Sequence, residues 1–184
     1  ADFVARRLEA AMKGFGTDEH ILVRLLGGLD AVSEPSVGAV SAAYERKYGR
    51  TLHEALRSEI SGSFLKAAIA WTEAAAKPSL EALTEAAFDE GTASLEALDA
   101  LLEERDEISA AVAAADAGTV RDACRGFGTD DGALVAALAC RSKPHLQRVG
   151  RAYYDAYGET LVGVLRGETS GWYRLLLNYL ALAP

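Results

Sequence analysis

The chain has 184 residues, half of them hydrophobic and only four of them proline, so it can bury a substantial core and is not a disordered chain. Its formal net charge of −8 argues against nucleic acid as a partner, and against attachment to anionic lipid unless a cation intervenes. Alanine and leucine predominate and β-branched residues do not alternate, which predicts an all-α protein.

Residues 1–76 predict a first module of five short helices separated by glycine or serine breaks. Thr17 is the expected N-cap of the second helix, Pro35 or Ser36 the expected start of the third, and Thr51 the expected cap of the fourth. Trp71 falls on the apolar face of the fifth helix. The expected breaks, in chain order, are Gly14, Gly27-Gly28, Ser33–Ser36, Tyr48-Gly49 and Ser61-Gly62.

Residues 77–116 are alanine-rich and acidic, and they carry apolar residues at helical spacing. Two interpretations stay open for this segment. Glu90-Gly-Thr92 is either the remnant of a glycine loop in a shortened, degenerate repeat, or part of a plain helical linker.

Residues 117–184 predict a second module that repeats the order of the first. A short first helix closes between Val120 and Cys124, Thr129 caps the second helix, and Lys143-Pro144 forms the next connection. The third helix is expected to end at Gly158 and the fifth to run from Trp172 to Leu182.

One stretch occurs twice, which marks an internal duplication. The two copies are Met12-Lys-Gly-Phe-Gly-Thr-Asp-Glu19 and Cys124-Arg-Gly-Phe-Gly-Thr-Asp-Asp131. Each is followed by a second matching mark, Glu59-Ile-Ser-Gly62 or Glu168-Thr-Ser-Gly171. Because the acid lies at nearly the same distance beyond each glycine loop, the pattern predicts a duplicated site.

A glycine loop after a helix exposes carbonyl oxygens, because glycine permits the turn and the last helical carbonyls lack partners. Such carbonyls together with one carboxylate make an all-oxygen site, and calcium tolerates its irregular geometry better than magnesium does. In each predicted site, three residues contribute backbone carbonyls and one glutamate binds through its carboxylate. The predicted Ca²⁺ ligands are Met12, Gly14, Gly16 and Glu59 in the first site, and Cys124, Gly126, Gly128 and Glu168 in the second.

Both modules resemble annexin repeats in their Gly-Phe-Gly-Thr-Asp loops, in Tyr48-Gly49 and Tyr157-Gly158, and in the downstream acids. The resemblance implies five-helix repeats and calcium-dependent attachment to acidic phospholipid membrane surfaces. On that pattern the same ligand set carries over position by position. Most annexins have four repeats, whereas this chain shows two complete ones, and three extra residues fall in the Gly27 to Ser36 connection.

The loop tips are predicted to contact the membrane. Phe15 and Phe127 stand where they could enter the lipid interface, with Lys13 and Arg125 beside them to meet phosphate. The alternative is that the two phenylalanines are ordinary packing residues.

An enzyme is a poor fit, because the loop lacks the third glycine of a dinucleotide fingerprint and the lysine of a P-loop. The serious alternative function is a structural subunit that docks on protein partners in a larger assembly, with calcium incidental. We expect a cytoplasmic protein, peripheral at membranes, and leave open a targeting segment that is removed.

The remaining expectations concern cysteines and aromatic residues. Cys124 and Cys140 show no zinc or redox spacing, so both are expected to be free thiols, and Cys140 is expected to be buried and inert. Core or interface positions are expected for the aromatic residues Trp71, Trp172, Tyr153 and Tyr154.

Overall fold

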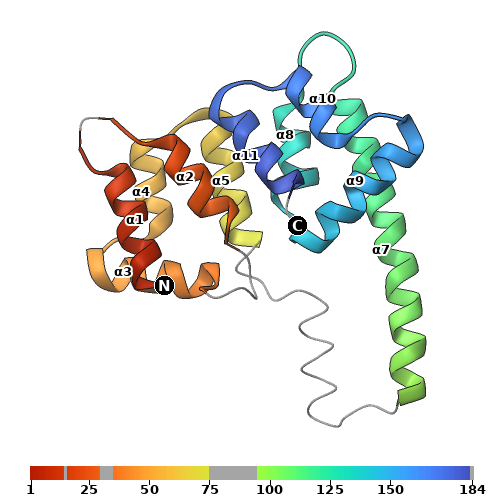
Figure 1. The fold of residues 1–184 in the computed structure, drawn as a ribbon, viewed down its shortest axis with the longest axis horizontal. Coiled ribbons are helices and arrows are strands. Elements are labelled where there is room, and N and C mark those ends of the chain that lie inside the picture. Colours follow the sequence, from red (N-terminus) through yellow and green to blue (C-terminus); the bar gives the residue numbers. More distant parts are fainter. Residues whose placement is uncertain (15, 30–34, 75–94, 183–184) are drawn as a thin grey trace.

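The computed structural model describes residues 1–14, 16–29, 35–74 and 95–182. Every regular element within these ranges is a helix, which confirms the all-α prediction (Figure 1). The helices are α1 (Asp2–Met12), α2 (Glu19–Gly27), α3 (Val37–Tyr48), α4 (Leu52–Glu59), α5 (Gly62–Ala74), α7 (Leu95–Ala123), α8 (Asp131–Leu134), the π-helix η1 (Val135–Ala139), α9 (Lys143–Tyr157), α10 (Leu161–Glu168) and α11 (Gly171–Ala181).

Several predicted helix ends are confirmed by their local chemistry. Ser36 caps α3, and Thr51 caps α4 in a reciprocal capping box with Glu54. The third helix of each module ends at a left-handed glycine, Gly49 with φ 68° and Gly158 with φ 70°. Residues 30–34, which include part of the expected Ser33–Ser36 connection, lie outside the described residues.

Two predicted caps are wrong by one residue. The N-cap of α2 is Asp18, whose Oδ1 accepts the Ile21 amide at 3.0 Å, and the N-cap of α8 is Asp130, whose Oδ1 accepts the Ala133 amide at 3.0 Å. A carboxylate competes well for this position because it also meets the positive end of the helix dipole. Thr17 and Thr129 are therefore available for other partners.

The second module departs from prediction in its first three helices. The expected short helix ending at Cys124 is the last part of α7, which is 29 residues long because its alanine-rich sequence contains no proline to break it. The second helix is divided into α8 and η1. Lys143 begins α9, with the neighbouring proline in its first turn, where no hydrogen bond of the helix is lost.

The structure describes only part of the middle segment, residues 77–116. Glu90-Gly-Thr92 lies outside the described residues, so the choice between a degenerate repeat and a plain linker stays a prediction. The expected boundary between 77–116 and 117–184 falls inside α7.

The two modules pack on each other through α2 and α5 on one side and α11 and η1 on the other (Figure 1). Gly27 of α2 lies so close to α11 that a Cβ there would stand 2.5 Å from Cδ1 of Tyr179. Ser63 of α5 donates a hydrogen bond of 2.5 Å to the Asp131 carboxylate at the start of α8. The chain therefore has one continuous hydrophobic core.

The outcomes for aromatic residues and thiols are mixed. Trp71 and Tyr153 are fully buried, whereas Trp172 and Tyr154 are 39% and 54% exposed. Both cysteines are free, as predicted, but Cys140 is exposed, so the prediction that it is buried is wrong. It follows the last residue of η1, where the chain turns at the molecular surface.

Candidate functional site

The paired glycines of the two loops have similar, positive φ angles. Gly14 and Gly16 adopt φ values of 127° and 94°, and Gly126 and Gly128 adopt 107° and 92°. A side chain would strain the backbone at each of these positions, which explains why both loops carry glycine there. The described part of the chain has no non-glycine residue with positive φ.

One backbone hydrogen bond closes each loop. The Asp18 amide donates to the Ala11 carbonyl at 2.8 Å, and the Asp130 amide donates to the Ala123 carbonyl at 3.0 Å. The bond holds the start of the following helix against the last turn of the preceding one. Each loop thus begins at a helix C-terminus, where partial negative charge accumulates.

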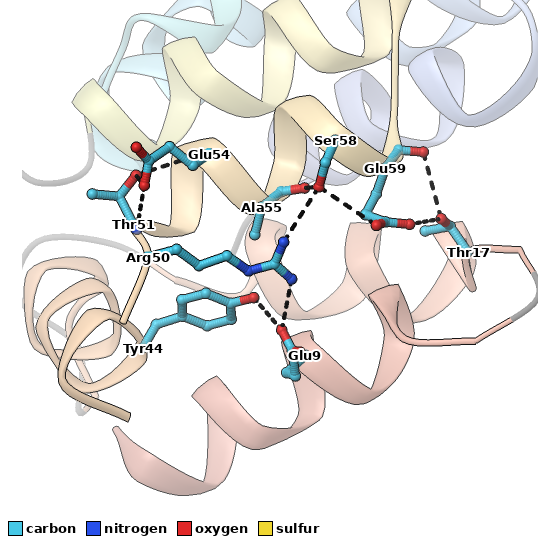
Figure 2. A network of polar contacts seen from close by, with 9 residues as sticks. All are labelled: Glu9, Thr17, Tyr44, Arg50, Thr51, Glu54, Ala55, Ser58 and Glu59. Atoms are coloured by element: carbon cyan, nitrogen blue, oxygen red, sulfur yellow. Dashed lines mark hydrogen bonds and ion pairs between the residues drawn. The ribbon is translucent and has the colours of Figure 1, made fainter. Parts of the chain in front are cut away.

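A threonine hydroxyl joins each loop to its distant acid. Thr17 Oγ1 donates to Glu59, 3.2 Å from Oε2 and 3.5 Å from the backbone carbonyl (Figure 2). Thr129 Oγ1 donates to Glu168, 2.8 Å from the backbone carbonyl and 3.4 Å from Oε2. The structure thereby brings each predicted acid next to its predicted loop.

The side chains of Met12 and Cys124 are poorly suited to a metal. The Met12 side chain is buried in the core, away from solvent. The Cys124 thiol is half-buried, and burial, followed by the negative charge of Glu168, raises its pKa to about 11. Because a protonated thiol is a poor metal ligand, only the carbonyl of Cys124 is suited to a metal.

The two acids differ in their surroundings. Glu59 is half-buried, whereas Glu168 is exposed. Ser58 stands beside Glu59 with its hydroxyl 3.5 Å from Oε1, while the residue before Glu168 is Gly167. The two sites thus share a backbone frame and differ in the groups around the carboxylate.

The loop tips point into solvent where the structure describes them. Phe127 is fully exposed, and Lys13 and Arg125 are exposed beside the glycines. Phe15 lies outside the described residues, so its predicted position stays a prediction. The packing alternative does not apply to Phe127.

The donor set fits a hard cation. Among the described residues there is no grouping of three or more histidine, cysteine, aspartate or glutamate side chains that could hold a metal. The groups that each described loop brings together are backbone oxygens and the oxygens of one glutamate. Such an all-oxygen set suits calcium, which accepts irregular geometry.

Sequence reasoning missed the role of Thr17 and Thr129, because threonine before two acids is also a common N-cap. It also missed the polar network of Glu9, Tyr44 and Arg50 behind the first site (Figure 2). One signal in the sequence could have revealed the role of the threonine. Threonine follows Gly-Phe-Gly in both copies, although the next residue, an aspartate, already supplies the N-cap of the following helix.

The model of the annexin family matches residues 3–71 and 115–180. The chain belongs to the annexin family. Annexin A6 of Gallus gallus is 30% identical to it over 187 residues, and Annexin A11 of Homo sapiens is 30% identical over 173 residues. As a member of this family the chain is not an enzyme.

A solved structure of calcium-bound annexin (Sm)1 shares the fold. Its TM-score is 0.73 at 23% identity, and the match covers 98% of this chain and 47% of that one. The chain spans only part of the length of these relatives. The match to Annexin A6 covers 100% of this chain and 27% of Annexin A6, and the match to Annexin A11 covers 94% of this chain and 26% of Annexin A11. Within the described ranges, no helix is both long and apolar enough to cross a membrane.

Proposed function

We propose that this annexin chain binds calcium at its two glycine loops and, through calcium, attaches to acidic phospholipid membrane surfaces. The ligands are the carbonyls of the two loops with Glu59 and Glu168. Lys13, Phe15, Arg125 and Phe127 contact the lipid.

One observation carries the proposal, namely that two distant pieces of chain meet in the same way twice. Each loop has its two left-handed glycines, its closing amide-to-carbonyl bond and its threonine hydroxyl on the downstream acid. Packing alone does not require a hydroxyl to join each glycine loop to the backbone carbonyl and the carboxylate of a distant glutamate, one of which, Glu168, is exposed. A cation that binds both groups accounts for the arrangement.

The two loops face the same way. In Figure 1, α1 and α7 both run towards the upper side of the molecule, so the C-terminal ends at which the loops begin lie on that side. Two weak sites on one side reinforce each other on a surface that offers many ligands. The net charge of −8 opposes direct attachment to an anionic surface, and a bridging cation would offset this repulsion.

The affinity for calcium alone is expected to be weak. One carboxylate per site leaves bound calcium with net positive charge and open coordination positions. By ligand charge count, this places the dissociation constant without lipid at ~10⁻⁴ to 10⁻³ M. Phosphate oxygens of lipid supply the missing ligands and tighten binding by linkage.

Co-sedimentation with vesicles tests the proposal. Vesicles of phosphatidylserine and phosphatidylcholine should pellet the chain in millimolar calcium, and excess chelator should release it. Equal pelleting with and without calcium contradicts the bridging mechanism. Absence of pelleting in both conditions favours the alternative of a structural subunit that docks on proteins.

The exposed tip of the second loop provides a separate prediction. Phe127→Ser should lower vesicle affinity several-fold at fixed calcium, because burying an aromatic side chain contributes on the order of 2 kcal/mol and partial insertion less. Calcium affinity without lipid should not change, since the loop ligands are carbonyls. Vesicle titration and calorimetry measure the two quantities.

Phe3→Ser is the matched control for this variant. Phe3 is also an exposed phenylalanine, 64% exposed, but it lies at the start of α1, away from the loops. Its loss should leave vesicle binding unchanged. Equal losses in the two variants, or a lowered melting temperature for Phe127→Ser, would contradict insertion of the loop tip.

A further inference from the structure

Trp172 is an exposed tryptophan on the side of the molecule that carries the calcium loops. It lies in the first turn of α11, directly after Gly171, and 39% of its surface is accessible. In Figure 1, α11 runs down from the upper side of the molecule to the C-terminus, so its first turn lies on the side at which both loops begin. The indole is therefore placed to meet the surface that the loops meet.

Trp172 is close to the second calcium site. The proposed ligand Glu168 ends α10, and the Thr129 hydroxyl joins it to the second loop. Trp172 follows Glu168 by four residues, and four residues of backbone span at most about 14 Å. The indole is therefore anchored beside the second site.

The Trp172 ring also reaches the first module. It makes an edge contact with the His20 ring, with 6.3 Å between the two centroids. His20 is exposed and lies in the first turn of α2, four residues after Gly16 of the first loop, so the same limit of about 14 Å holds for its distance from that glycine. The two rings thus bridge the modules on the surface between the two loops.

The equivalent position of the first module has a different chemistry. Ser63 stands four residues after the proposed ligand Glu59, in the first turn of α5. It is half-buried, and its hydroxyl donates to the Asp131 carboxylate at the start of α8, at 2.5 Å. A small hydrogen-bonding residue is therefore sufficient to join the modules at this position. Joining the modules does not explain the large, exposed indole of Trp172.

The polar group of the Trp172 ring is free. Trp71, the other tryptophan of the chain, is fully buried, and its Nε1 donates to the Leu26 carbonyl at 2.8 Å. The Trp172 N–H donates to no residue that the structure describes. A ring with an apolar body and a free N–H prefers the boundary between lipid headgroups and acyl chains, where one end stays wet.

The surroundings favour lipid over a protein partner as the cover for this ring. The two loops on either side of it carry the exposed side chains of Lys13, Arg125 and Phe127. Basic and aromatic residues together suit the headgroup region of an anionic membrane. A protein docked on Trp172 would compete with the membrane for the same surface.

We propose that Trp172 is a further membrane contact, which enters the headgroup region of an acidic phospholipid surface between the two calcium-loaded loops, with His20 orienting its ring. This inference rests on the proposed function. Removing the ring should lower vesicle affinity about three- to tenfold at fixed calcium, because an aromatic ring that inserts only partly contributes less than a fully buried one.

Quenching by brominated lipid tests the position of the ring. Vesicles of phosphatidylserine and phosphatidylcholine with bromine high on the acyl chains should quench the tryptophan fluorescence of the parent chain in millimolar calcium, and excess chelator should restore it. Trp172→Phe leaves Trp71 as the single tryptophan and should show little quenching. The difference between the two chains therefore reports Trp172 alone.

Vesicle titration of two serine variants measures the contribution to binding. Trp172→Ser should show the three- to tenfold loss, with calcium affinity unchanged in calorimetry without lipid. Trp172→Phe keeps an aromatic ring and should lose less. Leu182→Ser is the matched control, because Leu182 is 63% exposed and follows the opposite end of α11. It should bind vesicles like the parent.

The outcomes separate this inference from the proposed function. If vesicles pellet the parent chain in calcium but Trp172 is not quenched, or Trp172→Ser binds like the parent, the inference is overturned and the proposed function stands. Self-association of the parent in calcium that Trp172→Ser abolishes, measured by sedimentation velocity without vesicles, would show that the ring covers a protein surface and would also overturn it. If vesicles do not pellet the parent in calcium, both fail.

Discussion

Glu59→Gln combined with Glu168→Gln is expected to abolish calcium-dependent vesicle binding at calcium concentrations that saturate the parent chain. Each glutamate is the only charged protein ligand in its proposed site, and glutamine keeps its shape but removes the charge and the bidentate grip. The loss of a charged contact is worth ~1.5–3 kcal/mol, or roughly ten- to a hundredfold, at each site. Because the two sites reinforce each other, the double variant should require more than about a hundredfold more calcium.

The fold should survive this change, since Glu168 is exposed, Glu59 is only half-buried, and glutamine can still accept from Thr17 or Thr129. Glu45→Gln with Glu107→Gln makes a matched control, because both residues are exposed and the net charge changes by the same amount. The control pair should pellet like the parent. A double Glu59/Glu168 variant that titrates calcium like the parent would show that the ligand assignment is wrong.

Trp71→Ala is expected to cause the largest loss of stability among single substitutions in the first module. Trp71 is fully buried, and its Nε1 donates to the Leu26 carbonyl at 2.8 Å, which ties α5 to the end of α2. Removing the ring leaves a cavity and removes this hydrogen bond, although the Leu26 carbonyl still accepts from the Leu29 amide at 3.1 Å, and the expected cost is about 3–5 kcal/mol. The melting temperature should fall by roughly 10 °C or more.

Trp172→Ala is the matched comparison, because Trp172 is 39% exposed and its ring makes an edge contact with His20 at 6.3 Å between centroids. Its loss should cost about 1 kcal/mol or less. Thermal unfolding of the two variants, followed by circular dichroism, measures the difference. Similar melting temperatures for both would contradict the assignment of Trp71 to the centre of the core.

The helices of the first module were predictable because their ends depend on neighbours in sequence. A serine or threonine that accepts an amide three residues ahead, as Ser36 and Thr51 do, needs no tertiary contact. The left-handed turns at Gly49 and Gly158 follow from glycine itself. Where two candidates compete locally, as Thr17 and Asp18 do, the outcome depends on a partner elsewhere in the chain.

The long α7 shows the limit of this reasoning. Gly118 suggests a helix break, but it stays within α7, where Tyr157 Oη would stand 3.9 Å from an added Cβ. Packing of α7 against α9 offsets the small propensity cost of one glycine. A boundary expected near residue 117 thus falls inside α7, which ends at Ala123.

The sequence by itself determined the all-α class, the duplication, the glycine positions and the pairing of each loop with one downstream acid. These follow from composition, from periodicity and from a repeated motif. Only the tertiary structure decided that Thr17 and Thr129 hold the acids, that Trp172 meets His20 between the loops, and that Cys140 is exposed. The physical reason is that a hydrogen bond or an ion pair between residues some 40 positions apart depends on how helices pack, and the local pattern around either residue carries no record of its partner.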